Sequence, residues 1–232
     1  MVSRSIHWNG KGAASVLLAL GAAWVSSCTS TSTQTTARQP YHAKAHRPNN
    51  PSNVRVKVSL ANQMVYVMEG DRPLLVTPTC VGTAAKPTPA GNFRITIKTA
   101  KRRSNSYGFY HNPSTGQLIS NQGNKRPPGW RYVGYPLPYW CEFKSAYGFH
   151  GGWVHPTPRS HGCLRLHQNV APKFFALVNV GTPVNIARTQ PEDATIGQNV
   201  PRPADYNDPE YPAHILTTDQ IFSLYQGEIF EN

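Results

Sequence analysis

The stretch 147–166, YGFHGGWVHPTPRSHGCLRL, contains the residues around which the rest of the chain is organised. Cys163 directly follows His161 and Gly162, and a second histidine, His150, precedes a pair of glycines. A cysteine attacks a carbonyl as its thiolate, so it needs a base and backbone N–H groups that stabilise the charge developing on oxygen. Glycine beside a nucleophile lets the backbone fold tightly enough to aim such N–H groups at one point. The stretch therefore contains the parts of a thiol acyl-transfer site.

Two motifs in this stretch, FHG at 149–151 and SHGCLRL at 160–166, resemble the active-site signature of the L,D-transpeptidases, whose catalytic domain is of the YkuD type. The resemblance covers roughly residues 54–187. It implies that a peptidoglycan stem peptide acylates Cys163, that His150 is the base and that no cofactor is needed. The other site residues that we expect are Gly151, Ser160, His161 and Gly162, which would orient the loop or stabilise the oxyanion, and Arg165, which would bind substrate.

Charge is distributed unevenly along the chain, which has a formal net charge of +12. Between Arg72 and Pro191 the only acidic residue is Glu142, whereas eight acidic residues follow Pro191. Paired-carboxylate hydrolysis and hard-metal sites need several carboxylates, so the basic body is a poor candidate for either. A backbone carbonyl rather than a carboxylate is then expected to orient His150.

The excess of positive charge has two interpretations. It either makes a soluble surface with a high isoelectric point or attracts a polyanion such as peptidoglycan or an anionic wall polymer. Nucleic acid would fit the charge, but the sequence contains no nucleic-acid-binding motif. We therefore expect peptidoglycan stem peptides as partners and no nucleic acid.

The first 53 residues are predicted to lie outside the catalytic body. Residues 1–28 have a positive start, an apolar core too short to span a bilayer, and small residues before Cys28. This pattern resembles a bacterial lipoprotein signal, in which a lipid on Cys28 anchors the exported protein in the cell envelope; the alternative is a plain secretory peptide. Residues 29–53 are rich in Ser, Thr, Gln and Pro, and so predict a flexible tether that lets the body reach the wall.

Short segments with alternating apolar residues, separated by Gly and Pro, predict a mainly β fold. Its expected form is a YkuD-like sandwich or compact barrel-like arrangement of sheets, with one short helix after Cys163 and another near the C-terminus. Between them, residues 101–138 lack periodicity and are expected to form a long functional loop. The predicted strands are 54–60, 63–68, 74–81, 92–98 and 182–187, and a helix is predicted within 167–180. Residues 188–232 form an acidic, Pro-rich extension with a predicted helix from 217 to about 226. We expect this extension to pack on the basic body.

Two pairs of residues allow more than one interpretation. Tyr139 and Trp140 are either core aromatics or the wall of a substrate groove, because rigid rings add contact area at low entropic cost. Cys80 and Cys141 form a disulfide in an exported protein or remain separate buried side chains.

Rival functions also use the same residues. With water in place of an amine acceptor, Cys163 and His150 would make an L,D-carboxypeptidase or endopeptidase, and another acceptor would make an enzyme that ligates or releases a wall-anchored protein. His150, His155, His161 and Cys163 are also four candidate zinc ligands, although their spacing matches no common zinc pattern. A noncatalytic wall-binding module is the remaining alternative.

Overall fold

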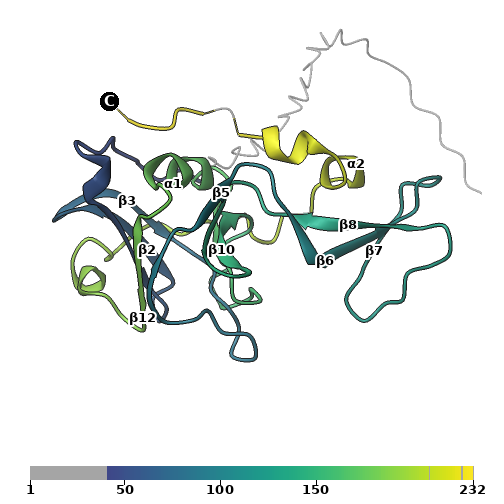
Figure 1. Cartoon of the computed structure of the whole chain (residues 1–232), viewed down its shortest axis with the longest axis horizontal. Helices are drawn as coiled ribbons and strands as arrows, with labels where there is room; N and C mark the ends of the chain where they lie inside the picture. Colours follow the sequence, from purple (N-terminus) through teal and green to yellow (C-terminus); the bar gives the residue numbers. More distant parts are fainter. Residues whose placement is uncertain (1–40, 209, 226, 232) are drawn as a thin grey trace, which may run out of the picture. The chain divides into compact units, whose positions relative to one another are not determined.

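The computed structural model describes residues 41–208, 210–225 and 227–231 (Figure 1). The predicted signal segment, Cys28 and the first part of the predicted tether lie outside these residues. Within the described ranges, no helix is both long and apolar enough to cross a membrane.

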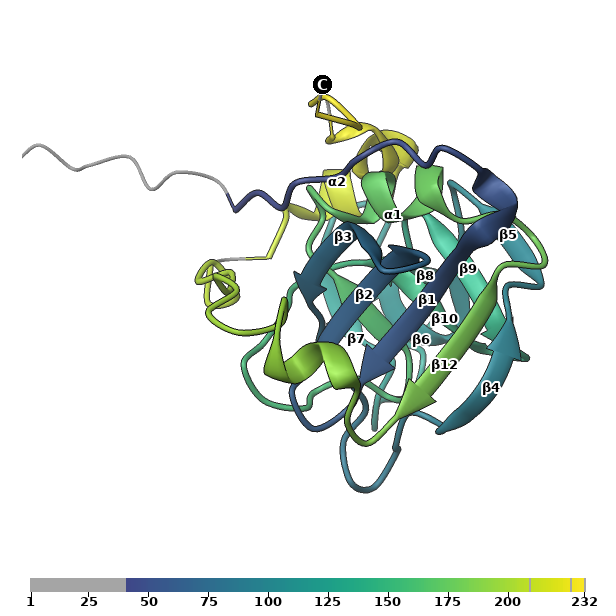
Figure 2. The same ribbon diagram turned by 90° about the vertical axis from the view of Figure 1, so that its left-hand side faces the viewer.

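The first sheet contains five strands in the order β3-β2-β1-β12-β4, and Figure 2 shows this sheet face on. β1 pairs antiparallel with β2 and parallel with β12, so the first and last strands of the predicted domain lie side by side at the centre of the sheet. The alternating valines of β1 are buried and its Arg55 is exposed, as the sequence predicts. The strands are β1 (Val54–Ser59), β2 (Met64–Glu69), β3 (Arg72–Pro78), β4 (Gly91–Arg94) and β12 (Pro183–Ala187).

The second sheet has the order β11-β10-β9-β5. Its strands are β5 (Ile97–Thr99), β9 (Trp140–Lys144), β10 (Tyr147–Gly151) and β11 (Leu164–Leu166). The single strand predicted over 92–98 is wrong, because the chain leaves the first sheet after β4 and joins the second sheet at β5. Between them, the Ile95 N–H bonds to Thr182 of the first layer, and the Thr96 N–H bonds to Glu142 of the second.

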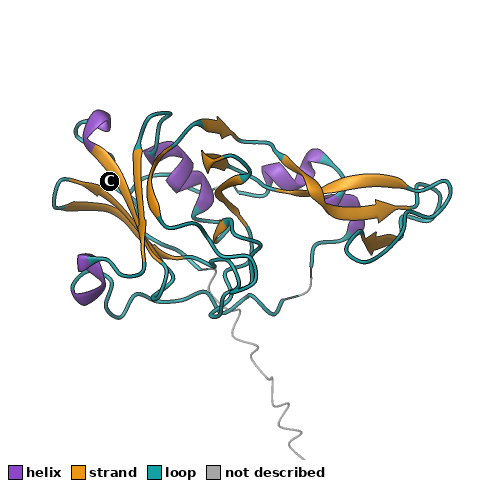
Figure 3. Cartoon of the chain, turned by 60° about the horizontal axis from the view of Figure 1, so that its bottom comes forward, coloured by secondary structure: helices purple, strands orange, loops and turns teal. Residues whose placement is uncertain are grey.

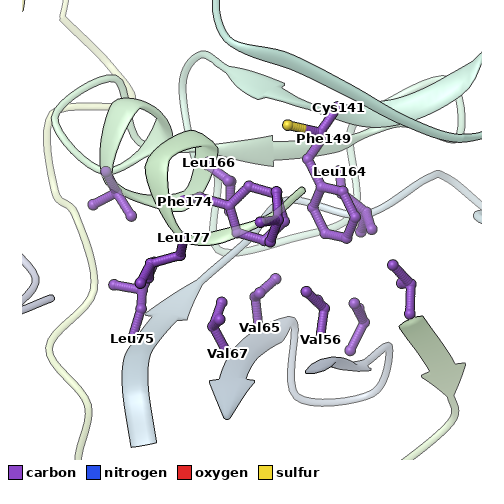
Figure 4. Close-up of a cluster of buried hydrophobic side chains, with 14 of the residues drawn as sticks. Val56, Val65, Val67, Leu75, Cys141, Phe149, Leu164, Leu166, Phe174 and Leu177 are labelled. Atoms are coloured by element: carbon purple, nitrogen blue, oxygen red, sulfur yellow. The ribbon is translucent and has the colours of Figure 1, made fainter. Parts of the chain in front are cut away.

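The core lies between these two sheets, with helix α1 (Ala171–Leu177) closing one end (Figure 4). Val56, Val65 and Val67 from the first sheet face Phe149 and Leu164 from the second. Burial of each such side chain contributes about 1.5–3 kcal/mol, so this layer dominates the stability of the domain. The predicted helix after Cys163 is confirmed, and its proline lies in the first turn, where the missing N–H does no harm.

A third sheet replaces the long loop predicted over residues 101–138. Its strands β6 (Arg103–His111), β7 (Leu118–Ser120) and β8 (Arg131–Pro136) run antiparallel in the order β7-β6-β8. Figure 3 shows these strands extending beside the other two sheets. Polar and aromatic residues on both faces hide the period of two, because little of this sheet is buried.

The described part of the predicted tether is packed on the body, so a flexible tether reaching to residue 53 is wrong. Ala45 is fully buried and bridges to Leu75, and the His46 N–H donates to the Leu74 carbonyl. Residues 51–53 form the 3-10 helix η1 (Pro51–Asn53) directly before β1. The alanines at alternate positions are small enough to enter the core, which a composition count does not reveal.

The acidic extension packs on the basic body, as predicted. In η2 (Pro191–Ala194), the Asp193 carboxylate accepts hydrogen bonds from Ser59 and Tyr66, and Glu192 pairs with Lys57. Arg103 of the third sheet donates to backbone carbonyls near the end of the extension. The single helix predicted over 217–226 is wrong; a helical turn α2 (Ala213–Leu216) is followed by the 3-10 helix η3 (Asp219–Ser223).

Removal of residues 188–232 is expected to lower the free energy of unfolding by about 3 kcal/mol or more, because it exposes Tyr66, Met64 and Met68 on the outer face of the first sheet. Urea unfolding followed by circular dichroism measures the change. In the full chain, Tyr66→Phe removes only the hydroxyl bond to Asp193 and should cost about 1 kcal/mol. Equal midpoints for the truncated and full chains would show that the extension adds no stability.

Candidate active site

The two strands that carry the predicted catalytic residues lie side by side. β10 and β11 run parallel, with Phe149 opposite Leu164 and His150 opposite Arg165. Phe149 and Leu164 point into the core, and because side chains alternate along a strand, His150 and Arg165 point to the other face. Cys163 directly precedes β11, so the thiol, the imidazole and the guanidinium gather on one face of the second sheet.

The protonation state of His150 follows from its contacts. Its Nδ1 lies 2.9 Å from the backbone oxygen of Gly151, and a carbonyl only accepts, so Nδ1 carries the proton and Nε2 keeps a lone pair. Only 4% of the residue is exposed. Burial, reinforced by the nearby Arg165 charge, lowers the pKa of His150 to about 4. The imidazole is therefore neutral at physiological pH, and a backbone carbonyl orients it, as predicted from the scarcity of acids.

Trp140 supports His150 from within the protein. Its ring stacks on the imidazole with centroids 6.2 Å apart, while the Arg102 guanidinium lies 4.7 Å from the indole ring. Trp140 is 1% exposed, so the interpretation of this residue as a groove wall is wrong and the core interpretation is confirmed. Gly148 makes room for the indole, because a Cβ there would lie 2.8 Å from its ring. Tyr139, by contrast, is partly exposed and lines a pocket.

The thiol of Cys163 is half-buried and points toward the turn between β9 and β10, where it lies 3.7 Å from the Ala146 carbonyl oxygen. Burial raises the pKa of this thiol, and the Gly148 N–H and the charges of Arg165 and Arg102 oppose the rise. Cys163 is therefore a thiol at rest that lies among groups suited to its anion.

The other two described cysteines differ from Cys163. Cys80 and Cys141 are free and buried, so the structure does not contain the disulfide that the sequence allows. Burial raises the pKa of Cys141 to about 12. Of the three described thiols, only that of Cys163 is partly open to solvent, and so only Cys163 can meet a substrate.

Ser160 fixes the backbone of the loop that carries the thiol. Its buried hydroxyl accepts the Gly162 N–H at 2.9 Å and donates to the Cys163 carbonyl at 2.5 Å. Gly162 has φ +109°, and a Cβ there would meet the Tyr147 ring at 2.6 Å, so only glycine fits. The Gly162 N–H is thus already bonded, which corrects its expected place in the oxyanion hole. The Cys163 N–H makes no hydrogen bond to a described residue and remains available.

His161 lies at the surface against the third sheet. Its ring packs on Tyr107 of β6 with centroids 4.3 Å apart, and Lys86 donates to the Tyr107 hydroxyl. Partial burial, with help from the Lys86 charge, lowers the pKa of His161. Sequence reasoning missed Tyr107, which lies in the segment expected to be a long loop, and Lys86, which lies between two of the predicted strands. The contact places the third sheet against the catalytic loop.

The structure also shows where the Arg165 side chain lies and whether the four candidate zinc ligands come together. The Arg165 side chain passes Gly152, since a Cβ on that glycine would lie 3.7 Å from Arg165 Cδ, and its charge acts on Cys163, His150 and His161. The four candidate zinc ligands do not converge: throughout the described part of the chain, no three His, Cys, Asp or Glu side chains are grouped to hold a metal ion.

Residues 53–186, more than half of the chain, match the family model of the L,D-transpeptidase catalytic domain, YkuD. No curated protein matches the chain. Among solved structures, it is similar to an L,D-transpeptidase from Stackebrandtia nassauensis, with 22% identity over 64% of this chain and 60% of that one and a TM-score of 0.44. A mutant L,D-transpeptidase from Enterococcus faecium has 22% identity over 58% of this chain and 50% of that one, with a TM-score of 0.43. An L,D-transpeptidase from Xylanimonas cellulosilytica has 17% identity over 61% of this chain and 63% of that one, with a TM-score of 0.45.

The chain therefore spans between half and two thirds of the length of these three solved chains. The family match covers both motifs of the active-site face, from His150 to Arg165, and stops one residue before the end of β12. The chain belongs to the L,D-transpeptidase family that the YkuD catalytic domain defines.

Proposed function

We propose that this protein is a cysteine-dependent L,D-transpeptidase that crosslinks peptidoglycan stem peptides through a thioester on Cys163. The observation that carries the proposal is the face shared by β10 and β11, where a partly open thiol and a neutral histidine with a free Nε2 lie on adjacent strands. The positive charges of Arg102 and Arg165 beside them suit a peptide substrate that bears free carboxylates.

The first step forms the thioester. His150 Nε2 takes the Cys163 proton as Sγ attacks the carbonyl that follows an L-residue, and the Cys163 N–H stabilises the oxyanion, an interaction worth about 3 kcal/mol of barrier. The imidazolium then returns the proton to the leaving D-residue amine. Because the pair is neutral at rest, attack and proton transfer occur together.

The second step releases the product. An amine on a neighbouring stem attacks the thioester, His150 accepts its proton, and the thiolate leaves and is protonated. The same steps with water would trim stems instead of joining them.

The cellular setting is part of the proposal. Residues 1–28 would direct export, a lipid on Cys28 would anchor the protein in the envelope, and residues 54–187 and 188–232 would be the catalytic domain and its extension. Growth in the presence of a labelled fatty acid, with Cys28→Ser as control, tests the anchor.

Incubation of the protein with purified peptidoglycan, followed by digestion and mass spectrometry, tests the reaction. We expect new stem-to-stem crosslinks that lack the terminal D-residue of the donor. Trimmed stems without crosslinks would identify the hydrolytic alternative, and unchanged muropeptides would refute acyl transfer to or from Cys163.

A further inference from the structure

The extension builds one side of an aromatic pocket next to the active-site face. The body contributes Tyr135, Tyr139 and Trp153, and the extension contributes Tyr211, Phe222 and Tyr225. Trp153 and Tyr211 stack across this junction, with centroids 6.0 Å apart and an interplanar angle of 12°. The family match ends before the extension begins, so this pocket is an addition to the catalytic domain.

The pocket is close to His150. Gly151 and Gly152, the two residues after this histidine, are part of its lining. A Cβ placed on Gly152 would lie 3.9 Å from His150 Cε1, the ring atom between the two nitrogens. Gly152 thus belongs to the pocket lining and is also a neighbour of the imidazole.

Glu210 gives the pocket its charge, because it is the only acidic residue of the lining. Most other acidic residues of the extension have partners: Glu192 with Lys57, Asp205 with His167, Asp219 with Lys101. Glu210 is exposed and forms no ion pair or hydrogen bond with a described residue. A free carboxylate beside aromatic faces attracts an ammonium group, both by charge and through the ring quadrupoles.

The size of the pocket limits its ligand. Its volume of about 40 Å³ accommodates roughly three water-sized groups, which is enough for the end of an aminoalkyl chain and too little for a sugar ring. Arg165, the nearest cation to Gly152, suits the carboxylates of the donor stem.

Resting on the proposed function, we infer that Glu210 and the aromatic pocket bind the side-chain ammonium of the acceptor stem beside the active-site face, before this group loses a proton and attacks the Cys163 thioester as an amine. On transfer, the amine nitrogen bonds to the acyl carbon and the carbon–sulfur bond breaks. Of the two protons that the ammonium loses, His150 passes one to solvent, and the other ends on Sγ. Glu210 is a binding residue and takes no proton.

Steady-state transfer to Nα-acetyl-lysine amide, from a stem tetrapeptide donor, tests the inference. We expect Glu210→Gln to raise the KM for this amine about tenfold, to leave kcat at saturating amine within twofold, and to increase the ratio of hydrolysis to transfer. Glu228→Gln removes the same charge from an exposed residue of the extension that does not line the pocket, and should behave as the wild type. Glu210→Asp should restore most of the affinity.

Acylation by a β-lactam separates this inference from the function on which it rests. Wild-type protein that is never acylated would refute the proposed function. Normal acylation of Glu210→Gln together with an unchanged KM for the amine would overturn the acceptor site alone. As a readout without turnover, n-pentylammonium should bind Cys163→Ala in calorimetry and lose that binding when Glu210→Gln is added.

Discussion

Cys163→Ala is expected to abolish thioester formation, lowering the rate of acyl transfer by a factor on the order of 10⁶, as loss of a catalytic nucleophile does in comparable enzymes. The loss should be this large because neither of the other described thiols can substitute. Both are buried, and the pKa of Cys141 is raised to about 12. Intact mass spectrometry after incubation with an acylating β-lactam measures the adduct directly.

Cys80→Ala is the matched control, since it also removes one sulfur atom, from a buried thiol that a substrate cannot reach, and leaves the backbone bridge from residue 80 to Arg165 in place. It should be acylated at the wild-type rate. Peptide mapping of the adduct must place it on Cys163; an adduct on another residue, or undiminished crosslinking by Cys163→Ala, would exclude the mechanism.

His150→Gln should slow acylation by about 10²–10⁴-fold, the usual contribution of a general base, while Cys163 stays in place. Glutamine fills much of the imidazole volume and can retain a donor toward the Gly151 carbonyl, so it limits damage to the packing against Trp140. His155→Ala, at a partly exposed residue whose ring packs on Tyr206, is the control. Comparable rates for the two variants would remove His150 from the base role.

The pH dependence of acylation should identify the same residue. Burial lowers the pKa of His150 to about 4 and raises that of Cys163, so the reactive neutral pair exists between these two values. The acylation rate should stay level from about pH 8 to about pH 5 and halve near pH 4. A half-maximal rate near 6.5 would instead indicate an ordinary imidazole.

The free energy of unfolding should also decrease as pH falls, so it must be measured at each pH together with the acylation rate. The unfolded chain binds a proton at His150 below about pH 6.5, whereas the folded protein resists protonation until about pH 4. The stabilisation associated with a neutral His150 is thus complete above the unfolded pKa and decreases as pH falls. Circular dichroism at each pH separates this loss from the loss of catalysis.

Local sequence was sufficient for the parts of the fold that are decided by burial of one face. The valines of β1 and the apolar residues of β12 are correctly predicted because, in each strand, side chains that face the core alternate with side chains that do not. The motif around Cys163 likewise predicts the thiol and the histidine that the structure brings to one face.

The failures have physical causes that no local pattern contains. β4 and β5 read as one strand because Ile95 is buried at the point where the chain changes sheets, so the alternation continues through the crossing. The third sheet has too little burial to show a period. The bond from Gly162 to Ser160 depends on the conformation of a loop, and the Glu210 pocket depends on two segments that meet only in the folded chain.

The placement of β12 between β1 and β4 sets the order in which the domain can be built. Val56 pairs with Val184, so the sheet has a gap at its centre until the last strand has left the ribosome. Contacts this distant in sequence form slowly. The first sheet can therefore close only after the whole of residues 54–187 is available, so we expect the incomplete domain to stay open to proteases until β12 has been added.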